Sequence, residues 1–507
     1  MRSKKALINT ASGLIYEMIA VICGLILPRL ILGYFGSKYN GITSSISQFL
    51  SCIALMKAGI GGASNAAFYK ALSKKDNYEI SAIVKTTQSF MNKIAAFFVA
   101  FIAVFSILYA AFFSKEFGFL FTVSLIIIIS ISTFGEYFFG YTYERLLGSD
   151  QCQYVFSFIR IFTTILNTII ASLLIVNGFG IHAVKLVSSL VFLINPIFIK
   201  TYARRKYHID DKVLADNNLL SQRWDAVAHE VANFINTNTD IMVLTFFTNV
   251  MEVSVYTVYN TVIMGVRKVV YSFVTGFGAA FGNMYAKGEM ELMEKNFRIY
   301  ELIVFSMVSV IYTITVIMFV PYANLYTSGV YDVNYARPIF AYIITMAGAF
   351  SCIRIPYQNI VMCAGHFKQT KNGAFVEAIL NICISIVCVI KIGLVGVAIG
   401  TVVANVFRTV QYVIYMSNHV LKRSKMLFIK HLLIFIAVFV FTNLISYSVF
   451  NLNCITAIDW IATAIEVAGV ALILTIATDY LFYKSDLMSM LRKLNGALRI
   501  KNRNNNA

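Results

Sequence analysis

Apolar runs long enough to cross a lipid bilayer recur along almost the whole chain, from Leu7 to near Leu481. The hydrocarbon core of a bilayer is roughly 30 Å thick, and a helix needs about 20 apolar residues to cross it. No polar domain separates the runs, and hydrophobic residues make up 59% of the 507 residues against 13% charged residues. A soluble core could not hide that much apolar surface. The sequence therefore predicts an all-α polytopic membrane protein with one membrane domain.

Polar breaks divide the runs into about fourteen predicted transmembrane helices, and an even number places both termini on the same side. The first run follows Arg2, Lys4 and Lys5, as in a signal peptide, but it continues to about Tyr34. That length exceeds the roughly 7 to 15 apolar residues of a signal peptide, so we predict a retained helix. The helices are predicted to begin near residues 7, 40, 92, 119, 154, 181, 226, 253, 300, 338, 372, 394, 428 and 459.

Basic residues are distributed unevenly between the two predicted sides. The net charge of +18 would suit nucleic acid, but 29 of the 42 Lys and Arg residues fall in connections on the side of the termini and only 4 on the other. Cytoplasmic loops of membrane proteins carry this excess. We therefore predict cytoplasmic termini in a plasma membrane and no nucleic acid partner. The opposite connections are short, which leaves little room for an external catalytic domain.

A weak internal repeat appears when the sequence is shifted against itself by 217 residues. The shift places Gly59-Ile-Gly-Gly-Ala63 on Gly276-Phe-Gly-Ala-Ala280, and Arg160 on Glu377. Two glycine-rich helix ends could coincide by chance, but transporter repeats leave this kind of weak symmetry. We predict two pseudo-symmetric six-helix lobes with the substrate at their interface. The predicted parts are the N-terminal lobe (1–203), a cytoplasmic linker (204–225), the C-terminal lobe (226–418), two additional transmembrane helices (426–483) and a basic cytoplasmic tail (484–507).

Two adjacent cations, Arg267 and Lys268, lie deep in the eighth predicted helix. A charge near the bilayer centre costs on the order of 2.5 to 3.5 kcal/mol, so such residues usually face a protein interior or a watery cavity. Both are about 14 residues, or ~20 Å, from either helix end, too far to reach the headgroups. Polar residues continue both helical faces, which favours contact with water. We predict that both cations bind substrate, with a structural ion pair as the alternative.

The seventh predicted helix carries a polar stripe in its inner half, formed by His229, Asn233, Asn236 and Asp240. Lipid cannot satisfy such groups. Asp240 could pair with Arg267, carry a proton or bind a cation, and the sequence leaves these roles open. We assign Asp240, together with Glu17 of the first helix, to coupling or gating.

Three further cations complete the predicted substrate-binding set. Lys57 precedes the glycine-rich stretch of the second helix, Arg29 follows Pro28 in the first, and Arg354 stands shortly before Pro356 in the tenth. Both prolines are predicted to kink or break their helices.

Snorkelling, in which a long side chain near a helix end reaches the headgroups, is the alternative for Arg29. It is the preferred interpretation for Lys93, Arg160 and Arg408.

The surplus of cations at these depths favours an anionic ligand, and a diphosphate most of all. An exporter of organic cations would need a surplus of acidic residues instead. The sequence has no G-x-x-x-x-G-K-[ST] phosphate loop, no H-E-x-x-H and no convincing nucleophile motif, so we predict neither an enzyme nor a bound cofactor or metal. A coupling cation, either H⁺ or Na⁺, is left open.

Several stretches together resemble a known family. They are Leu27-Pro-Arg-Leu-Ile-Leu-Gly33, Gly36-Ser-Lys-Tyr-Asn-Gly41, Gly59-Ile-Gly-Gly-Ala63, Leu147-Gly-Ser-Asp-Gln151, Thr239-Asp-Ile-Met-Val243, Val255-Tyr256 and Gly393-Leu-Val-Gly-Val-Ala-Ile-Gly-Thr401. The chain is similar over nearly its whole length to polysaccharide flippases. These form the Wzx-like branch of the multidrug, oligosaccharidyl-lipid and polysaccharide exporter superfamily, in the form common in Gram-positive bacteria. Gly148-Ser149 departs from the family pattern, which has a non-glycine residue before Asp-Gln.

The resemblance implies two six-helix lobes around a central cavity, followed by two extra helices. It implies alternating access that carries an undecaprenyl diphosphate-linked oligosaccharide across the plasma membrane, with membrane lipids and polysaccharide assembly proteins as further partners. The resemblance assigns the family's cationic position to Arg29 in the Pro-Arg motif and its acidic position to Asp240 in Thr-Asp-Ile.

Three other functions stay open at this point. A lipid II flippase also has fourteen helices and a basic cavity, whereas a multidrug antiporter usually has twelve helices and an acidic cavity. A polytopic glycan polymerase or ligase generally needs a large external catalytic loop, which this chain lacks.

Overall fold

The computed structural model describes residues 2–210, 212–215, 227–274 and 277–505, and within these ranges every regular element is a helix. In the part of the chain that the structure describes, eleven helical stretches are long and apolar enough to cross a membrane. The other predicted stretches are also helical and form α2, α3, α9 and α10, which are not among these eleven. The chain is thus an all-α, multi-pass membrane protein, as the sequence predicts.

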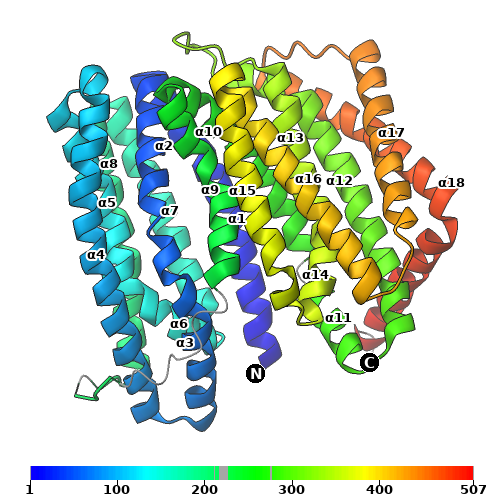
Figure 1. The fold of residues 1–507 in the computed structure, drawn as a ribbon, viewed down its shortest axis with the longest axis horizontal. Helices are drawn as coiled ribbons and strands as arrows, with labels where there is room; N and C mark the ends of the chain where they lie inside the picture. Colours follow the sequence, from blue (N-terminus) through cyan, green and yellow to red (C-terminus); the bar gives the residue numbers. More distant parts are fainter. Residues whose placement is uncertain (1, 211, 216–226, 275–276, 506–507) are drawn as a thin grey trace. The chain divides into compact units, whose positions relative to one another are not determined.

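The chain forms two compact units, residues 1–245 and 246–507. Unit 1 runs from the N-terminus through most of α9 (Figure 1). Its elements are α1 (Arg2–Phe35), α2 (Ser37–Ser51), α3 (Ala54–Lys74), α4 (Asn77–Phe117), α5 (Phe119–Gly135), the π-helical turn η1 (Glu136–Gly140), α6 (Tyr141–Ser149), α7 (Gln153–Val176), α8 (Ile181–Tyr207) and α9 (Val227–Phe247).

Unit 2 repeats much of this element order and ends in two further helices, α17 and α18 (Figure 1). Shifted by 217 residues, α7 falls on 370–393, where α15 lies, and α8 falls on 398–424, where α16 lies. Its elements are α10 (Val250–Val274), α11 (Phe277–Ala286), α12 (Met290–Tyr326), α13 (Pro338–Ile353), α14 (Ile355–Cys363), α15 (Phe367–Ile392), α16 (Leu394–His419), α17 (Met426–Val449) and α18 (Ala457–Asn505).

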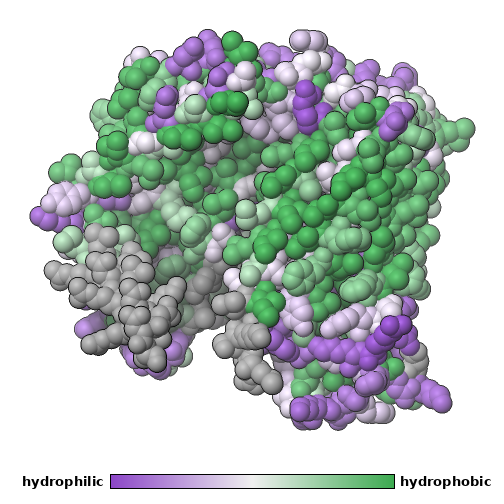
Figure 2. Space-filling view, turned by 180° about the vertical axis from the view of Figure 1, so that it is seen from behind, coloured by the Kyte–Doolittle hydropathy of each residue, from purple (hydrophilic) through white to green (hydrophobic). Residues whose placement is uncertain are grey.

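The outer surface of the helices is apolar because their solvent is lipid. Figure 2 shows hydrophobic side chains gathered across the middle of the helices and hydrophilic side chains at their ends. Large apolar residues such as Leu108, Leu120 and Ile390 are more than half exposed. In water such a surface would aggregate, whereas in a bilayer it anchors the helices.

Small residues let α15 and α16 approach closely. A Cβ on Gly400 would overlap Ser385 Oγ and lie 2.8 Å from the Ser385 backbone nitrogen. A Cβ on Gly396 would lie 2.5 Å from the Val389 backbone nitrogen. Membrane helices associate through this kind of close packing, because lipid tails are as apolar as the side chains.

Among the described residues, two of the eleven spans are interrupted near mid-length, one in each unit, and the second predicted helix is also interrupted, at Cys52 and Ile53 between α2 and α3. The tenth predicted helix breaks at Arg354, between α13 and α14, which confirms the break expected at Pro356. In unit 1 the π-helical turn η1 separates α5 from α6 without any proline, so no residue in the sequence marks this interruption. The helix α1 continues through Pro28 without a break.

A buried ionic cluster attaches the C-terminal helices to the rest of unit 2. Arg423, in the connection before α17, donates two hydrogen bonds of 2.7 Å to the Glu301 carboxylate on α12. Tyr357 donates a further short hydrogen bond to Glu301. His431 of α17 lies 3.6 Å from the same carboxylate and stacks on Tyr483 of α18. Both C-terminal helices are therefore tied to α12.

Candidate functional site

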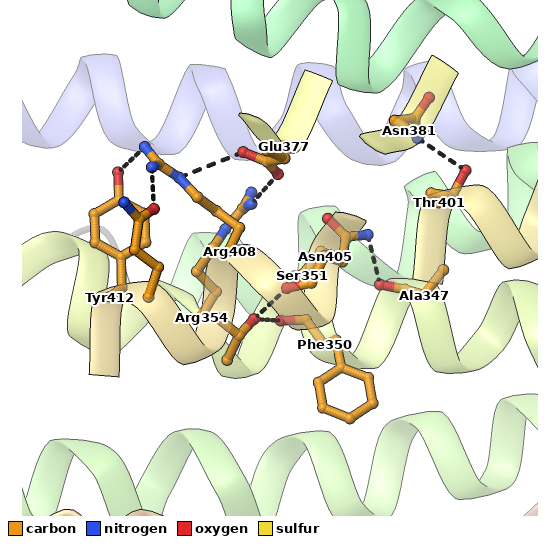
Figure 3. Close-up of polar contacts among 12 residues, drawn as sticks. Ala347, Phe350, Ser351, Arg354, Glu377, Asn381, Thr401, Asn405, Arg408 and Tyr412 are labelled. Atoms are coloured by element: carbon orange, nitrogen blue, oxygen red, sulfur yellow. Dashed lines mark hydrogen bonds and ion pairs between the residues drawn. The ribbon is translucent and has the colours of Figure 1, made fainter. Parts of the chain in front are cut away.

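A buried polar network lies between α13, α15 and α16 in unit 2 (Figure 3). Arg354 donates a 2.6 Å hydrogen bond from Nη1 to Glu377 Oε1, and Arg408 Nε lies 3.4 Å from Glu377 Oε2. All three residues are less than 9% exposed. One carboxylate therefore holds two guanidinium groups away from both lipid and water.

Arg408 makes further contacts that fix its guanidinium. It donates to the Thr370 carbonyl at 3.0 Å, to Gln411 Oε1 at 2.5 Å and to the Tyr412 hydroxyl at 2.8 Å. Its guanidinium also lies over the Tyr412 ring, 4.3 Å from the centroid. Snorkelling is therefore the wrong interpretation for Arg408, because neighbouring helices supply its partners inside the protein.

The network carries one surplus positive charge. Two arginines face one glutamate, and Arg354 Nε is buried without a hydrogen-bond partner among the residues described. Desolvating a charge costs several kcal/mol unless hydrogen bonds offset that cost. The arrangement therefore favours an additional negative group near the break between α13 and α14.

Polar contacts continue from this network along the same helices (Figure 3). Asn381 donates to Thr401 Oγ1 at 3.3 Å, and Asn405 donates to the Ala347 carbonyl at 3.1 Å. Hydrogen bonds of this kind hold membrane helices in register.

Arg267 and Lys268 lie on α10, and their side chains are half-buried and exposed respectively. Within the described part of the chain, Arg267 makes no hydrogen bond or ion pair. It lies close enough to Tyr312 and Cys352 to interact with them electrostatically. The structural ion pair weighed as the alternative for Arg267 is thus not formed with any residue that the structure describes.

Lys57 is bound within unit 1. Its ammonium lies 2.8 Å from Glu136 Oε1 and over the rings of Tyr137 and Tyr141, 4.7 and 5.5 Å from their centroids. Glu136 begins the π-helical turn η1. Such turns interrupt regular helices and often occur at functional sites.

Arg160 also has an internal partner, since its Nη2 lies 2.7 Å from Glu144 Oε1. These two residues and Glu136 line a cavity of about 200 Å³ between η1, α6, α7 and α8. The snorkelling predicted for Arg160 is therefore replaced by an ion pair at a polar cavity.

The other predicted residues of unit 1 lie apart from this cavity. Arg29 folds along α1 toward Gly33, where a Cβ would lie 3.4 Å from Arg29 Nη1. Glu17 is half-buried on α1, and Asp240 is 5% exposed on α9. The side chains of His229, Asn233 and Asn236 lie outside the described residues.

The acidic partners Glu377, Glu136 and Glu144 are not among the residues that the sequence predicts for the site. One signal for Glu377 was available, since the internal repeat sets it against Arg160, a charged residue at the same position of the other half. The pairing Lys57–Glu136 joins residues 79 apart in sequence, which no local pattern marks.

No protein-family model and no curated protein matches the sequence. Solved structures do match. The lipid II flippase MurJ in an inward closed conformation has a TM-score of 0.68 at 17% identity, covering 92% of this chain and 98% of MurJ. An inward-facing multidrug resistance MATE family transporter of the MOP superfamily has a TM-score of 0.59 at 14% identity, over 81% of this chain and 98% of its own. A mutant of the Vibrio cholerae MATE transporter VcmN reaches 0.60 at 14% identity, over 83% and 98%.

These likenesses establish the fold. The chain has the fold of the MurJ flippase and of these MATE transporters.

Proposed function

We propose that this protein flips an undecaprenyl diphosphate-linked oligosaccharide across the plasma membrane by alternating access, for polysaccharide export. The observation that carries the proposal is Arg267, a half-buried guanidinium within a membrane helix that has no hydrogen-bond or ion-pair partner among the described residues. Such a group is costly in lipid and is stabilised when a diphosphate binds it.

Other residues have supporting roles in this proposal. Lys268 and Arg29 add positive potential, and Arg354 contributes through the surplus charge that it shares with Arg408 and Glu377. Lys57 contributes less, because Glu136 neutralises it. Asp240 and Glu17 are proposed to couple or gate the cycle, with H⁺ or Na⁺ as the coupling ion.

A lipid II-type flippase is the second candidate. The overlap with the lipid II flippase MurJ covers a larger share of this chain than the overlaps with the MATE transporters do. Both candidate substrates carry a diphosphate on a polyprenyl chain and differ in the sugar.

The test is transport of fluorescent lipid-linked sugar across proteoliposomes containing the full-length protein. An arginine can hold two phosphate oxygens and a lysine only one point charge, so Arg267→Lys should impair transport and Arg267→Ala should reduce it roughly tenfold or more. Arg298→Ala is the matched control, since Arg298 forms an exposed pair with Glu294 one helical turn away. Full transport by well-folded Arg267→Ala would exclude the assignment. Parallel assays with lipid II and with an undecaprenyl diphosphate-linked repeat unit separate the two candidates.

A further inference from the structure

Asp479 of α18 is a buried acidic residue that takes no part in the proposed transport. It is 8% exposed and lies in the helical stretch Ala457–Met490, which is long and apolar enough to cross a membrane. Within unit 2, α18 packs against α12 and α17. Ionisable residues in such positions usually pair with another group inside the protein. The neighbours of Asp479 therefore indicate whether its carboxyl is charged or protonated.

A hydrogen bond joins Asp479 to α12. Ser306 Oγ lies 2.6 Å from Asp479 Oδ2 and 2.8 Å from the Leu302 carbonyl oxygen, which is one turn earlier on α12. A serine hydroxyl has one proton to donate, and a backbone carbonyl oxygen can only accept. Both contacts are full hydrogen bonds only when the Asp479 carboxyl supplies the second proton. In that arrangement Asp479 donates to Ser306, and Ser306 donates to Leu302.

The Asp479 carboxyl has no cation beside it. Within the described ranges it forms no ion pair, and its one hydrogen bond is that with Ser306. The basic residues of this region contact other groups: the Glu301 carboxylate for Arg423, a backbone carbonyl of α18 for Lys430 and the Tyr480 ring for Lys484. A counter-charge for an ionised Asp479 is therefore missing from the part of unit 2 that packs around it.

The other ionisable groups near Asp479 are acidic or aromatic. Tyr483, one turn further along α18, interacts electrostatically with Asp479, Glu301 and Asp486. Its ring stacks on His431 of α17, with the ring centroids 4.3 Å apart. Carboxylates that share one region disfavour each other's charged form. The acidic neighbours therefore add to the cost of ionising Asp479.

Burial without a cation favours the neutral form of a carboxyl, because a desolvated carboxylate is costly and a buried acid takes up a proton instead. We propose that Asp479 is a proton-binding site, which holds its proton in the native protein at neutral pH and donates it to Ser306 Oγ. The site joins α18 to α12 and lies wholly within unit 2, so it does not depend on the proposed transport substrate. Loss of the proton would leave a buried negative charge between these helices and weaken their contact.

The first test is infrared spectroscopy of the full-length protein in detergent at neutral pH. A protonated carboxyl has a carbonyl stretching band that a carboxylate lacks, so the wild type minus Asp479→Asn difference spectrum should contain that band. Asp459→Asn is the matched control, since Asp459 is an exposed aspartate on the same helix, and its difference spectrum should show a carboxylate instead. A carboxylate band in the Asp479→Asn difference spectrum would show that Asp479 is ionised and would exclude the proposal.

Ser306→Ala keeps the carboxyl and removes the group to which it donates. The variant should therefore shift the carbonyl band without abolishing it, because this band responds to hydrogen bonding of the carboxyl. It also serves as the test if Asp479→Asn does not fold. A band at the same position in Ser306→Ala and the wild type would contradict the assigned hydrogen bond.

Thermal unfolding across a range of pH is an independent test. A proton that the native protein holds and the unfolded chain has lost lowers the ratio of folded to unfolded protein by up to about tenfold for each unit of rising pH. The wild type should therefore lose stability relative to Asp479→Asn, whose side chain is neutral at every pH, as the pH rises from about 5 to about 8. Parallel curves for the two proteins would argue against a proton on Asp479.

Discussion

At the scale of single residues, two of the buried carboxylates in unit 2, those of Glu301 and Glu377, bind buried arginine side chains. Glu301 accepts hydrogen bonds from Arg423 and Tyr357. Glu377 forms ion pairs with both Arg354 and Arg408. Removing one partner of a buried pair costs far more than removing an exposed one, because a desolvated charge is left behind.

The variant Glu377→Gln should therefore destabilise the protein by about 3 to 5 kcal/mol, since it leaves two buried arginines without a counter-charge. Thermal unfolding in detergent measures the effect. Glu294→Gln is the matched control, because it removes an exposed pair worth no more than about 0.5 kcal/mol. Adding Arg354→Gln to Glu377→Gln should restore part of the loss. Equal unfolding temperatures for Glu377→Gln and Glu294→Gln would show that the network is not structural.

A second residue-scale prediction concerns Asp150, in the turn between α6 and α7. Burial raises the pKa of its carboxyl, but hydrogen bonds from Lys206, Tyr207 and Cys152 outweigh burial and hold the pKa below its ordinary value of 3.8. A lowered pKa stabilises the fold fully above the ordinary value and loses that effect as the pH falls through the folded value.

Asp150→Asn should accordingly unfold at a lower temperature than the wild type near neutral pH, by an amount that is constant down to about pH 5. Below that, the wild type should lose stability faster than the variant, and the two curves should converge as the pH falls below 3.8. Calorimetric scans across this range test it. A difference that stays constant to pH 3 would argue against the ionised carboxylate as the source of stability.

At the scale of elements, the two interrupted spans fall at equivalent positions of the repeat. The turn η1 covers 136–140, and a shift of 217 residues places it on 353–357, across the break at Arg354. An ion pair lies beside each interruption, and its positive and negative residues exchange places between the units. In unit 1 the residue on α7 is the cation Arg160, which pairs with Glu144. In unit 2 the residue on α15 is the anion Glu377, which pairs with Arg354. The symmetry thus extends to the position of the defects but not to the sign of the charges.

The close approach of α15 and α16 gives an element-scale prediction. Gly400→Ala should destabilise the protein by ~1 to 3 kcal/mol, because the new methyl group overlaps Ser385. Gly469→Ala on α18 is the control, since nothing lies within 4 Å of its added Cβ and alanine is the better helix former. If both variants unfold at the same temperature, the two helices do not depend on this contact.

The sequence predicts those elements that local residue patterns determine, and it does not predict those that depend on contacts between distant residues. The helices follow from apolar length, which is a local property, and the break at Arg354 follows from Pro356. The turn η1 has no such marker, because Glu136-Tyr-Phe-Phe-Gly140 contains ordinary helix residues. The partners of Arg408 come from α15 and from its own helix, so the distance to a helix end could not reveal them.

At the scale of the whole molecule, the orientation in the membrane is a prediction from the charge asymmetry. Lys38→Cys should react with an impermeant thiol reagent added outside intact cells, and Lys74→Cys should not, because the positive-inside rule places them on opposite sides. Both lysines are exposed, so burial in the protein does not make one introduced cysteine less accessible to the reagent than the other. The eight native cysteines are first replaced by serine. External labelling of Lys74→Cys would overturn the predicted topology.

The weak hydropathy of α10 has a consequence for synthesis. Insertion into the membrane disfavours an Arg or Lys at the centre of a helix by about 2.5 to 3.5 kcal/mol. Arg267 and Lys268 lie in the C-terminal half of α10, before its end at Val274, so together they oppose its entry by at most about 5 to 7 kcal/mol. The neighbours on which α10 packs, α12 and α13, follow it in the chain and leave the ribosome later. During biogenesis α10 must therefore stay at the translocon until these helices emerge, and substitutions in α12 or α13 should lower the yield of inserted protein before they alter any step of its working cycle.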